Sequence, residues 1–157
     1  MNLQNQLQRE LSSIGSGGAT TITAADPPHQ LSIDVAERNS LAVSFKDLRV
    51  ASSVLGGADA RKLEQVGNAL ATRLTYLMEP ISPIEVDAGH CVVQLRSSPP
   101  QRDDDGRSYY ELLVRSGGEI SLARYRKENG GPRQAVVATV TREVLLRLVG
   151  DFCAVLD

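Results

Sequence analysis

The second half of the chain, residues 81 to 157, contains five successive short segments in which apolar and polar residues alternate, followed by one amphipathic segment. Alternation of this kind is typical of β-strands with one face in a hydrophobic core, whereas apolar residues spaced three and four apart are typical of a helix. The pattern predicts a helix that begins after Thr141. It predicts strands at residues 84–87, 91–97, 108–116, 119–127 and 134–140.

The connections between these segments are short and rich in turn residues, as in Ser116-Gly117-Gly118 and Asn129-Gly130-Gly131-Pro132. Glycine, proline and asparagine favour the backbone conformations that tight turns require. A parallel crossover would need about a dozen residues or more, so links of this length predict antiparallel neighbours.

The first half of the chain adds a hairpin and a helix. Apolar residues alternate over residues 31–36 and again over 41–50, with a change of phase that predicts a β-bulge near Lys46 and Asp47. A helix is predicted over residues 59–79, with Asp59 as its cap and Pro80 as its stop. Its apolar stripe faces a core.

The predicted fold class is therefore α+β. We expect a curved antiparallel sheet of about five to seven strands, packed on one face by a long central helix and a C-terminal helix. A chain of 157 residues suits one domain with a full core. In outline this architecture resembles the small secretion-chaperone type of domain, without any shared motif.

The N-terminal segment, residues 1–30, is predicted to be a short amphipathic helix followed by a flexible linker rich in Gly, Thr and Pro, with the α+β domain spanning residues 31–157. A short helix needs a surface to pack against. It either folds on its own domain or serves as an arm that binds a partner or exchanges in a homodimer. The arm residues are Leu3, Leu7, Leu11 and Ile14.

Composition and charge argue against several classes of function. The net charge of −2 and the aromatic content of 4% disfavour nucleic-acid binding, which relies on clustered cations and stacked rings. No apolar run approaches the roughly 20 residues that span a bilayer. We expect a cytoplasmic protein that does not enter membranes, with Cys91 and Cys153 as buried free thiols.

Two clusters contain residue types that can support catalysis or metal binding. Asp87, His90 and Cys91 include the residue types of nucleophilic catalysis, but neighbours on a strand point to opposite faces. The acidic run at residues 103–105 lacks the alternating ligands of a calcium loop. We therefore predict no catalytic residue, no metal site and no cofactor.

The strands also carry arginines and tyrosines that alternation could place on one solvent-facing surface. Arginine suits acidic peptides and phosphate-bearing ligands, because its planar fork matches their geometry. The competing interpretation is an ordinary strand face with cross-strand pairs to Glu111, Glu119 and Glu128. The candidate partner-binding residues are Arg96, Arg115, Arg124, Arg126, Tyr109 and Tyr125.

Two functions follow as hypotheses. The first is a non-enzymatic protein-interaction or chaperone-like module, which binds an unidentified protein partner and forms a homodimer. The second is a carrier of a small apolar ligand, or an enzyme, with a pocket between the helices and the curved sheet. Leu70, Leu74 and Phe152 are the residues expected to line that pocket.

Overall fold

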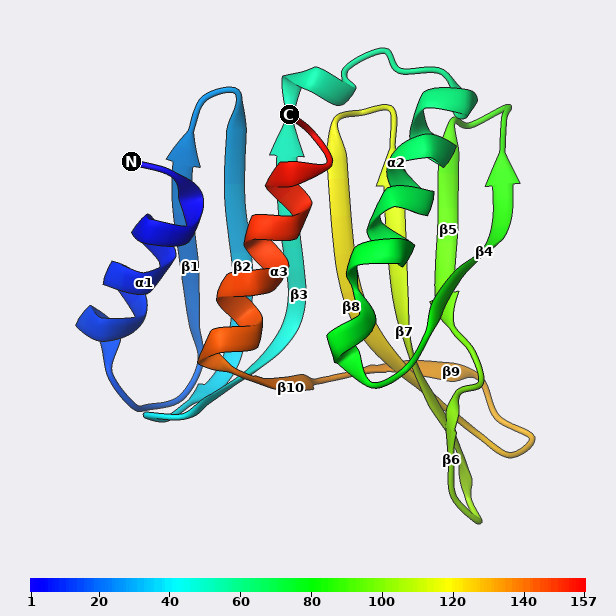
Figure 1. The fold of residues 1–157 in the computed structure, drawn as a ribbon. Helices are drawn as coiled ribbons and strands as arrows, with labels where there is room; N and C mark the ends of the chain where they lie inside the picture. The colour runs from blue at the N-terminus through cyan, green and yellow to red at the C-terminus, as the bar shows by residue number, and fades with distance from the viewer.

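The computed structural model describes residues 1–157 and contains one open antiparallel sheet with three helices. The main path through the sheet has the order β1-β2-β3-β8-β7-β5-β4 (Figure 1). Its strands are β1 (Thr20–Asp26), β2 (His29–Arg38), β3 (Ala42–Ser52), β4 (Ile81–Asp87), β5 (Val92–Ser97), β7 (Gly106–Arg115) and β8 (Glu119–Glu128). The α+β antiparallel prediction is confirmed.

Three short strands raise the total to ten, above the predicted range. β6 (Gln101–Arg102) pairs with β7, β9 (Arg133–Val136) with β8, and β10 (Ala138–Thr141) with β3. The segment predicted as one strand over residues 134–140 is therefore two strands, which belong to different parts of the sheet. β6 lies between the predicted strands 91–97 and 108–116, where the sequence predicted no strand.

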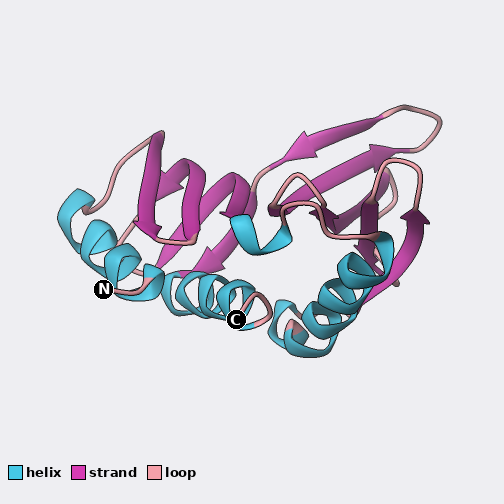
Figure 2. Cartoon of the chain, turned by 90° about the horizontal axis from the view of Figure 1, so that it is seen from above, coloured by secondary structure: helices cyan, strands magenta, loops and turns pink.

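The helices α1 (Leu3–Ile14), α2 (Ala60–Arg73) and α3 (Arg142–Ala154) lie on one side of the sheet, which leaves its other face uncovered (Figure 2). α1 and α3 contact the β1 to β3 region, and α2 contacts β4, β5 and β7. Apolar side chains from all three helices and from the sheet form one continuous buried core. We call the uncovered side the open face.

Side-chain caps fix where the helices begin. The carboxylate of Asp59 accepts a 2.9 Å hydrogen bond from the amide of Lys62, and the hydroxyl of Thr141 accepts one of 3.1 Å from Val144. Both predicted starts are confirmed. The central helix is shorter than predicted, because it ends at Arg73 and a 3₁₀ turn, η2 (Thr75–Leu77), carries the chain to Met78 in a left-handed conformation.

The predicted flexible linker is wrong for residues 20–30, which form β1 and the start of β2. The two prolines, Pro27 and Pro28, occupy the tight turn between these strands. The predicted bulge is confirmed: Asp34 pairs with Asp47 and Val35 with Phe45, so Lys46 has no partner in β2.

Helix α1 packs on its own domain. Leu3, Leu7 and Leu11 are buried, and Ile14 lies at the margin of the core. The side-chain amide of Gln6 donates to the carbonyl of Ala25 at 2.7 Å and accepts from its amide at 3.2 Å, which satisfies both backbone groups on the edge strand β1. Residues 1–14 are thus integrated into the fold of this chain.

The sheet forks in the middle. β3 pairs with β8 only where residues 48–51 lie opposite residues 119–122. Beyond that point β3 continues beside β10, whereas β8 continues beside β9 (Figure 1). Because β9 and β10 follow each other in the chain, they connect the two branches. The branch with β6, β7, β8 and β9 projects beyond the helices.

Candidate functional site

Four of the six predicted partner-binding residues share the open face. On β7 and β8 the even-numbered residues Leu112 and Leu122 belong to the core, so odd-numbered residues point to the open face. Tyr109 and Tyr125 are direct cross-strand partners there, and their ring centroids are 6.2 Å apart. The alternation of β5 and β7 places Arg96 and Arg115 on the same face.

Arg124 and Arg126 lie on the opposite face, so the prediction of one surface with six members is wrong. Arg124 donates to Glu79 at 3.0 Å and stacks over Tyr110. Arg126 forms two 2.9 Å hydrogen bonds with Asp103 and one of 2.7 Å with Glu128. These arginines are paired with carboxylates on the helix side of the sheet.

A network around Glu111 organises the open face. The Glu111 side chain is only 4% exposed, and it accepts hydrogen bonds from Gln94 at 3.0 Å and from both terminal nitrogens of Arg133. Arg96 lies 3.8 Å from the same carboxylate. Burial of a carboxylate is tolerated when cations and donors surround it. Glu111 therefore orients two arginines on this face.

The same arginines cover the tyrosine rings. The guanidinium carbon of Arg96 lies 4.4 Å from the ring centroid of Tyr109, and that of Arg133 lies 3.9 Å from that of Tyr125. Cation–π contacts of this kind hold the planar groups parallel to the rings. The sequence singled out Arg96 and both tyrosines. It named Glu111 as a cross-strand partner, and it missed Arg133, whose contacts depend on the pairing of β8 with β9.

An open hollow of about 270 Å³ lies beside this network, near the fork of the sheet. Small residues of β8, Ser121 and Ala123, line it together with Leu113. Charged side chains surround them, and two pairs among these neutralise each other: Arg49 with Asp47, and Arg115 with Glu119 at 3.5 Å. The cross-strand pairing expected of an ordinary strand face is thus present as well.

The acidic run at residues 103–105 forms a hairpin tip. The Asp103 carboxylate accepts 2.9 Å hydrogen bonds from the amides of Asp105 and Gly106, in addition to its bonds with Arg126. These contacts, with Arg126 the largest, lower the pKa of Asp103 to about 2. No group of three or more His, Cys, Asp or Glu side chains is arranged to hold a metal ion.

Acid should weaken the contacts of the Asp103 carboxylate only at a pH well below the usual pKa of an aspartate. Because the pKa of Asp103 falls from 3.8 to about 2 on folding, its stabilisation is fully present above 3.8 and disappears as the pH falls through about 2. NMR signals of the Asp105 and Gly106 amides should therefore shift with a midpoint near pH 2. Asp103→Asn should remove that transition, whereas a midpoint near 3.8 in the unmodified protein would contradict it.

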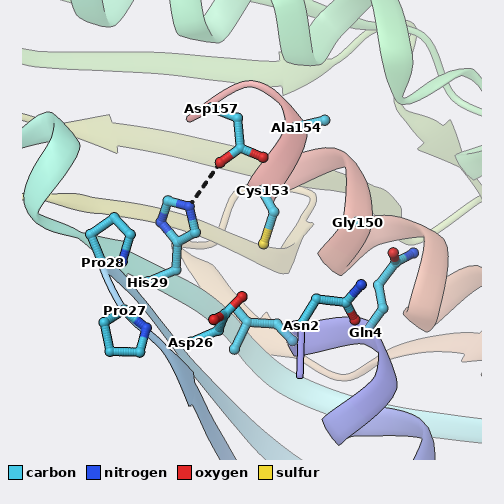
Figure 3. Close-up of a pocket in the computed structure, with 11 residues that line it drawn as sticks. Asn2, Gln4, Asp26, Pro27, Pro28, His29, Gly150, Cys153, Ala154 and Asp157 are labelled. Carbon is cyan, nitrogen blue, oxygen red and sulfur yellow. Dashed lines mark hydrogen bonds and ion pairs between the residues drawn. The ribbon is translucent and has the colours of Figure 1, made fainter.

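A second hollow, of about 280 Å³, lies between the start of α1, the β1–β2 turn and the end of α3 (Figure 3). His29 reaches it, and its Nε2 lies 3.1 Å from a carboxylate oxygen of Asp157. Its Nδ1 lies 2.8 Å from the hydroxyl of Ser52, which is buried and also accepts a hydrogen bond from Val54. Asp157, His29 and Ser52 are the residue types of a catalytic triad. Ser52 does not line the hollow, however, so its hydroxyl is not an accessible nucleophile.

Cys153 lines the same hollow (Figure 3). Burial, with smaller effects of Asp157 and Asp26, raises the pKa of its thiol to about 11. A thiolate is the reactive form of cysteine, so burial disfavours that form of Cys153 at neutral pH.

The structure also shows how Asp87, His90 and Cys91 lie relative to one another. His90 is 84% exposed, and its Nδ1 lies 2.8 Å from Asp87. The Cys91 thiol donates instead to the carbonyl of Ala88 at 3.4 Å, so the imidazole and the thiol are not hydrogen-bonded. The two groups do not form the pair that nucleophilic catalysis requires.

Comparisons with known proteins found no matching protein family, curated protein or solved structure. No helix is long and apolar enough to cross a membrane. The interpretation of the site therefore depends on its geometry alone.

Proposed function

We propose that this chain is a non-enzymatic, chaperone-like module that binds a protein partner on the open face of its sheet. The observation that carries the proposal is the network of Arg96, Tyr109, Glu111, Tyr125 and Arg133 on a face without helices. Arginine is among the residue types most enriched at the energetic centres of protein interfaces, and here the two tyrosine rings lie beneath the arginines and hold them in place. A cytoplasmic location remains a prediction from the sequence.

The order of this network supports the proposal. Long side chains lose conformational entropy when a partner immobilises them, which weakens binding. Here Glu111 and the two tyrosine rings already hold Arg96 and Arg133 in place. A partner would therefore contact arginines that are already ordered in the free protein, so that binding loses little further conformational entropy.

The alternative of an apolar-ligand pocket has less support. Its predicted lining residues Leu70, Leu74 and Phe152 are all 0% exposed and belong to the continuous core. Their side chains pack against other core residues, as a close-packed interior requires. No specific observation favours an enclosed ligand site between the helices.

Site-specific photo-cross-linking tests the proposal. Benzoylphenylalanine replaces Ala135, which is exposed on the open face beside Tyr125, or Ala69, which is exposed on α2. Each purified protein is irradiated in an extract of its native source. We expect a discrete adduct from the Ala135 position that disappears when an excess of unlabelled protein competes, with no such adduct from the Ala69 position.

Two results would contradict the proposal. One is the absence of any adduct from Ala135 that unlabelled protein displaces. The other is the same adduct from both positions, which would show that capture does not depend on the open face. Adducts must therefore be compared between the two positions, because capture of a protein by itself is not evidence.

A further inference from the structure

Four cations lie in one cross-strand row at the projecting end of the sheet. Arg102 of β6 pairs with Arg107 of β7, Arg107 pairs with Lys127 of β8, and Lys127 pairs with Arg133 of β9. Directly opposed residues share a face of the sheet. We call Arg102, Arg107, Lys127 and Arg133 the cation row. It lies on the open face, next to the row that contains Tyr109 and Tyr125.

The row is left largely unneutralised by the chain itself. Arg133 is paired with Glu111, but Arg102, Arg107 and Lys127 form no ion pair. Asp103 and Glu128, which adjoin Arg102 and Lys127 in the sequence, are bound to Arg126 on the opposite face, and Asp104 and Asp105 form no ion pair with the row. Like charges directly opposite each other destabilise a sheet. The row therefore lowers the stability of the fold, and its three unpaired cations are free to bind an anionic partner.

The neighbouring rings help to identify the class of anion. Single-stranded nucleic acids bind sheets by stacking bases on exposed aromatic faces. Tyr109 is only 3% exposed, and the guanidinium groups of Arg96 and Arg133 cover both rings. With no free ring for stacking, the surface favours carboxylates, which need only cations and donors.

We infer that the cation row binds an acidic, extended segment of the protein partner; this inference rests on the proposed function and specifies the partner's chemistry. Neighbouring strands are about 4.8 Å apart, so four positions span about 14 Å. In an extended chain, side chains on one side repeat about every 6.8 Å. Three Asp or Glu residues at alternate positions of the partner therefore match the length of the row.

Fluorescence anisotropy tests the inference directly. The probes are a labelled peptide of about 12 residues with alternating Glu and Ser, the corresponding Lys and Ser peptide, and an oligothymidylate of the same length. The row variants are Lys127→Glu and the double variant Arg102→Glu/Lys127→Glu, in which charges alternate in sign along the row. The matched controls are Lys62→Glu and Arg61→Glu/Lys62→Glu at exposed positions of α2, which change the net charge equally.

We expect the acidic peptide to bind the unmodified protein at moderate salt, and the lysine peptide not to bind. Lys127→Glu should weaken this binding about fivefold and the double variant more than about tenfold, whereas the α2 controls should leave it unchanged. The row variants should also raise the melting temperature, because each replaces repulsive cross-strand pairs by attractive ones. Loss of binding together with a gain in stability would exclude misfolding as the cause.

Several outcomes would overturn the inference. One is that the acidic peptide does not bind, and another is that the α2 controls lose binding as much as the row variants do. A third is that the oligothymidylate binds more tightly than the acidic peptide and the row variants abolish its binding, which would assign the row to nucleic acid. If the peptide fails but the cross-linked adduct at Ala135 still forms, the row is not the contact and the proposed function stands. If the adduct also fails, the proposed function fails with it.

Discussion

Leu7→Ala should lower the free energy of unfolding by about 3 kcal/mol, the usual cost of truncating a buried leucine to alanine. Leu7 is 0% exposed, and α1 packs against α3 and β1. The substitution would leave a cavity that the surrounding helix and strand cannot fill, because hydrogen bonds from Gln4 and Gln6 hold the helix in place. Urea unfolding followed by far-UV circular dichroism measures the change.

Ile14→Ala is the matched control within the same helix. Ile14 lies at the margin of the core, so its truncation should cost less than about 1 kcal/mol. Equal effects of the two substitutions would show that α1 is not anchored through Leu7.

Unfolding at several protein concentrations adds a test of the predicted homodimer, because exchange of α1 between subunits would make the midpoint depend on concentration. An α1 that folds on its own domain predicts no such dependence.

The fold was predictable wherever a local pattern determines the structure. Alternation identified β5, β7 and β8 and the end of β4, and side-chain chemistry identified the caps Asp59 and Thr141. A change of apolar phase located the bulge at Lys46. Each of these features depends on residues that are close in the sequence, which explains why they can be deduced without tertiary information.

Strand β1 shows how a local signal can be misinterpreted. Residues 20–26 are rich in β-branched Thr and contain a buried Ile22, which is a strand signature between turn residues. The flanking glycines and prolines outweighed it and led to the prediction of a linker. Pro27 and Pro28 instead occupy the hairpin turn, and Pro27 stands at the second turn position, where proline is favourable.

The candidate site was less predictable because it depends on strand register. The sequence alone cannot show that Arg102 lies opposite Arg107, or that Lys127 lies between Arg107 and Arg133. A shift of one residue moves every side chain to the other face. The face of Arg124 and Arg126 did not depend on register: both occupy even-numbered positions of β8, like the core residues Ile120 and Leu122, so alternation within this strand already places them opposite Tyr125.

Gly106→Ala should lower the free energy of unfolding by about 2 to 3 kcal/mol through overpacking against the backbone. A Cβ atom at this position would overlap the carbonyl oxygen of Lys127 and lie 3.0 Å from the Cα of Glu128. Both neighbours are main-chain atoms of β8, so no side chain can rotate to make room. The strands must separate at Gly106, next to the Arg107 and Lys127 pair.

Gly117→Ala provides the matched control in the neighbouring hairpin. A Cβ at Gly117 meets nothing within 4 Å, so this substitution should be neutral or slightly stabilising. Thermal unfolding of both variants measures the difference, and equal stability would contradict the close approach of β7 to β8. Gly106→Ala should also weaken binding of the acidic peptide, because separation of the strands displaces Arg107 from Lys127. A glycine that contacts no partner would thus control binding by setting the spacing of the cation row.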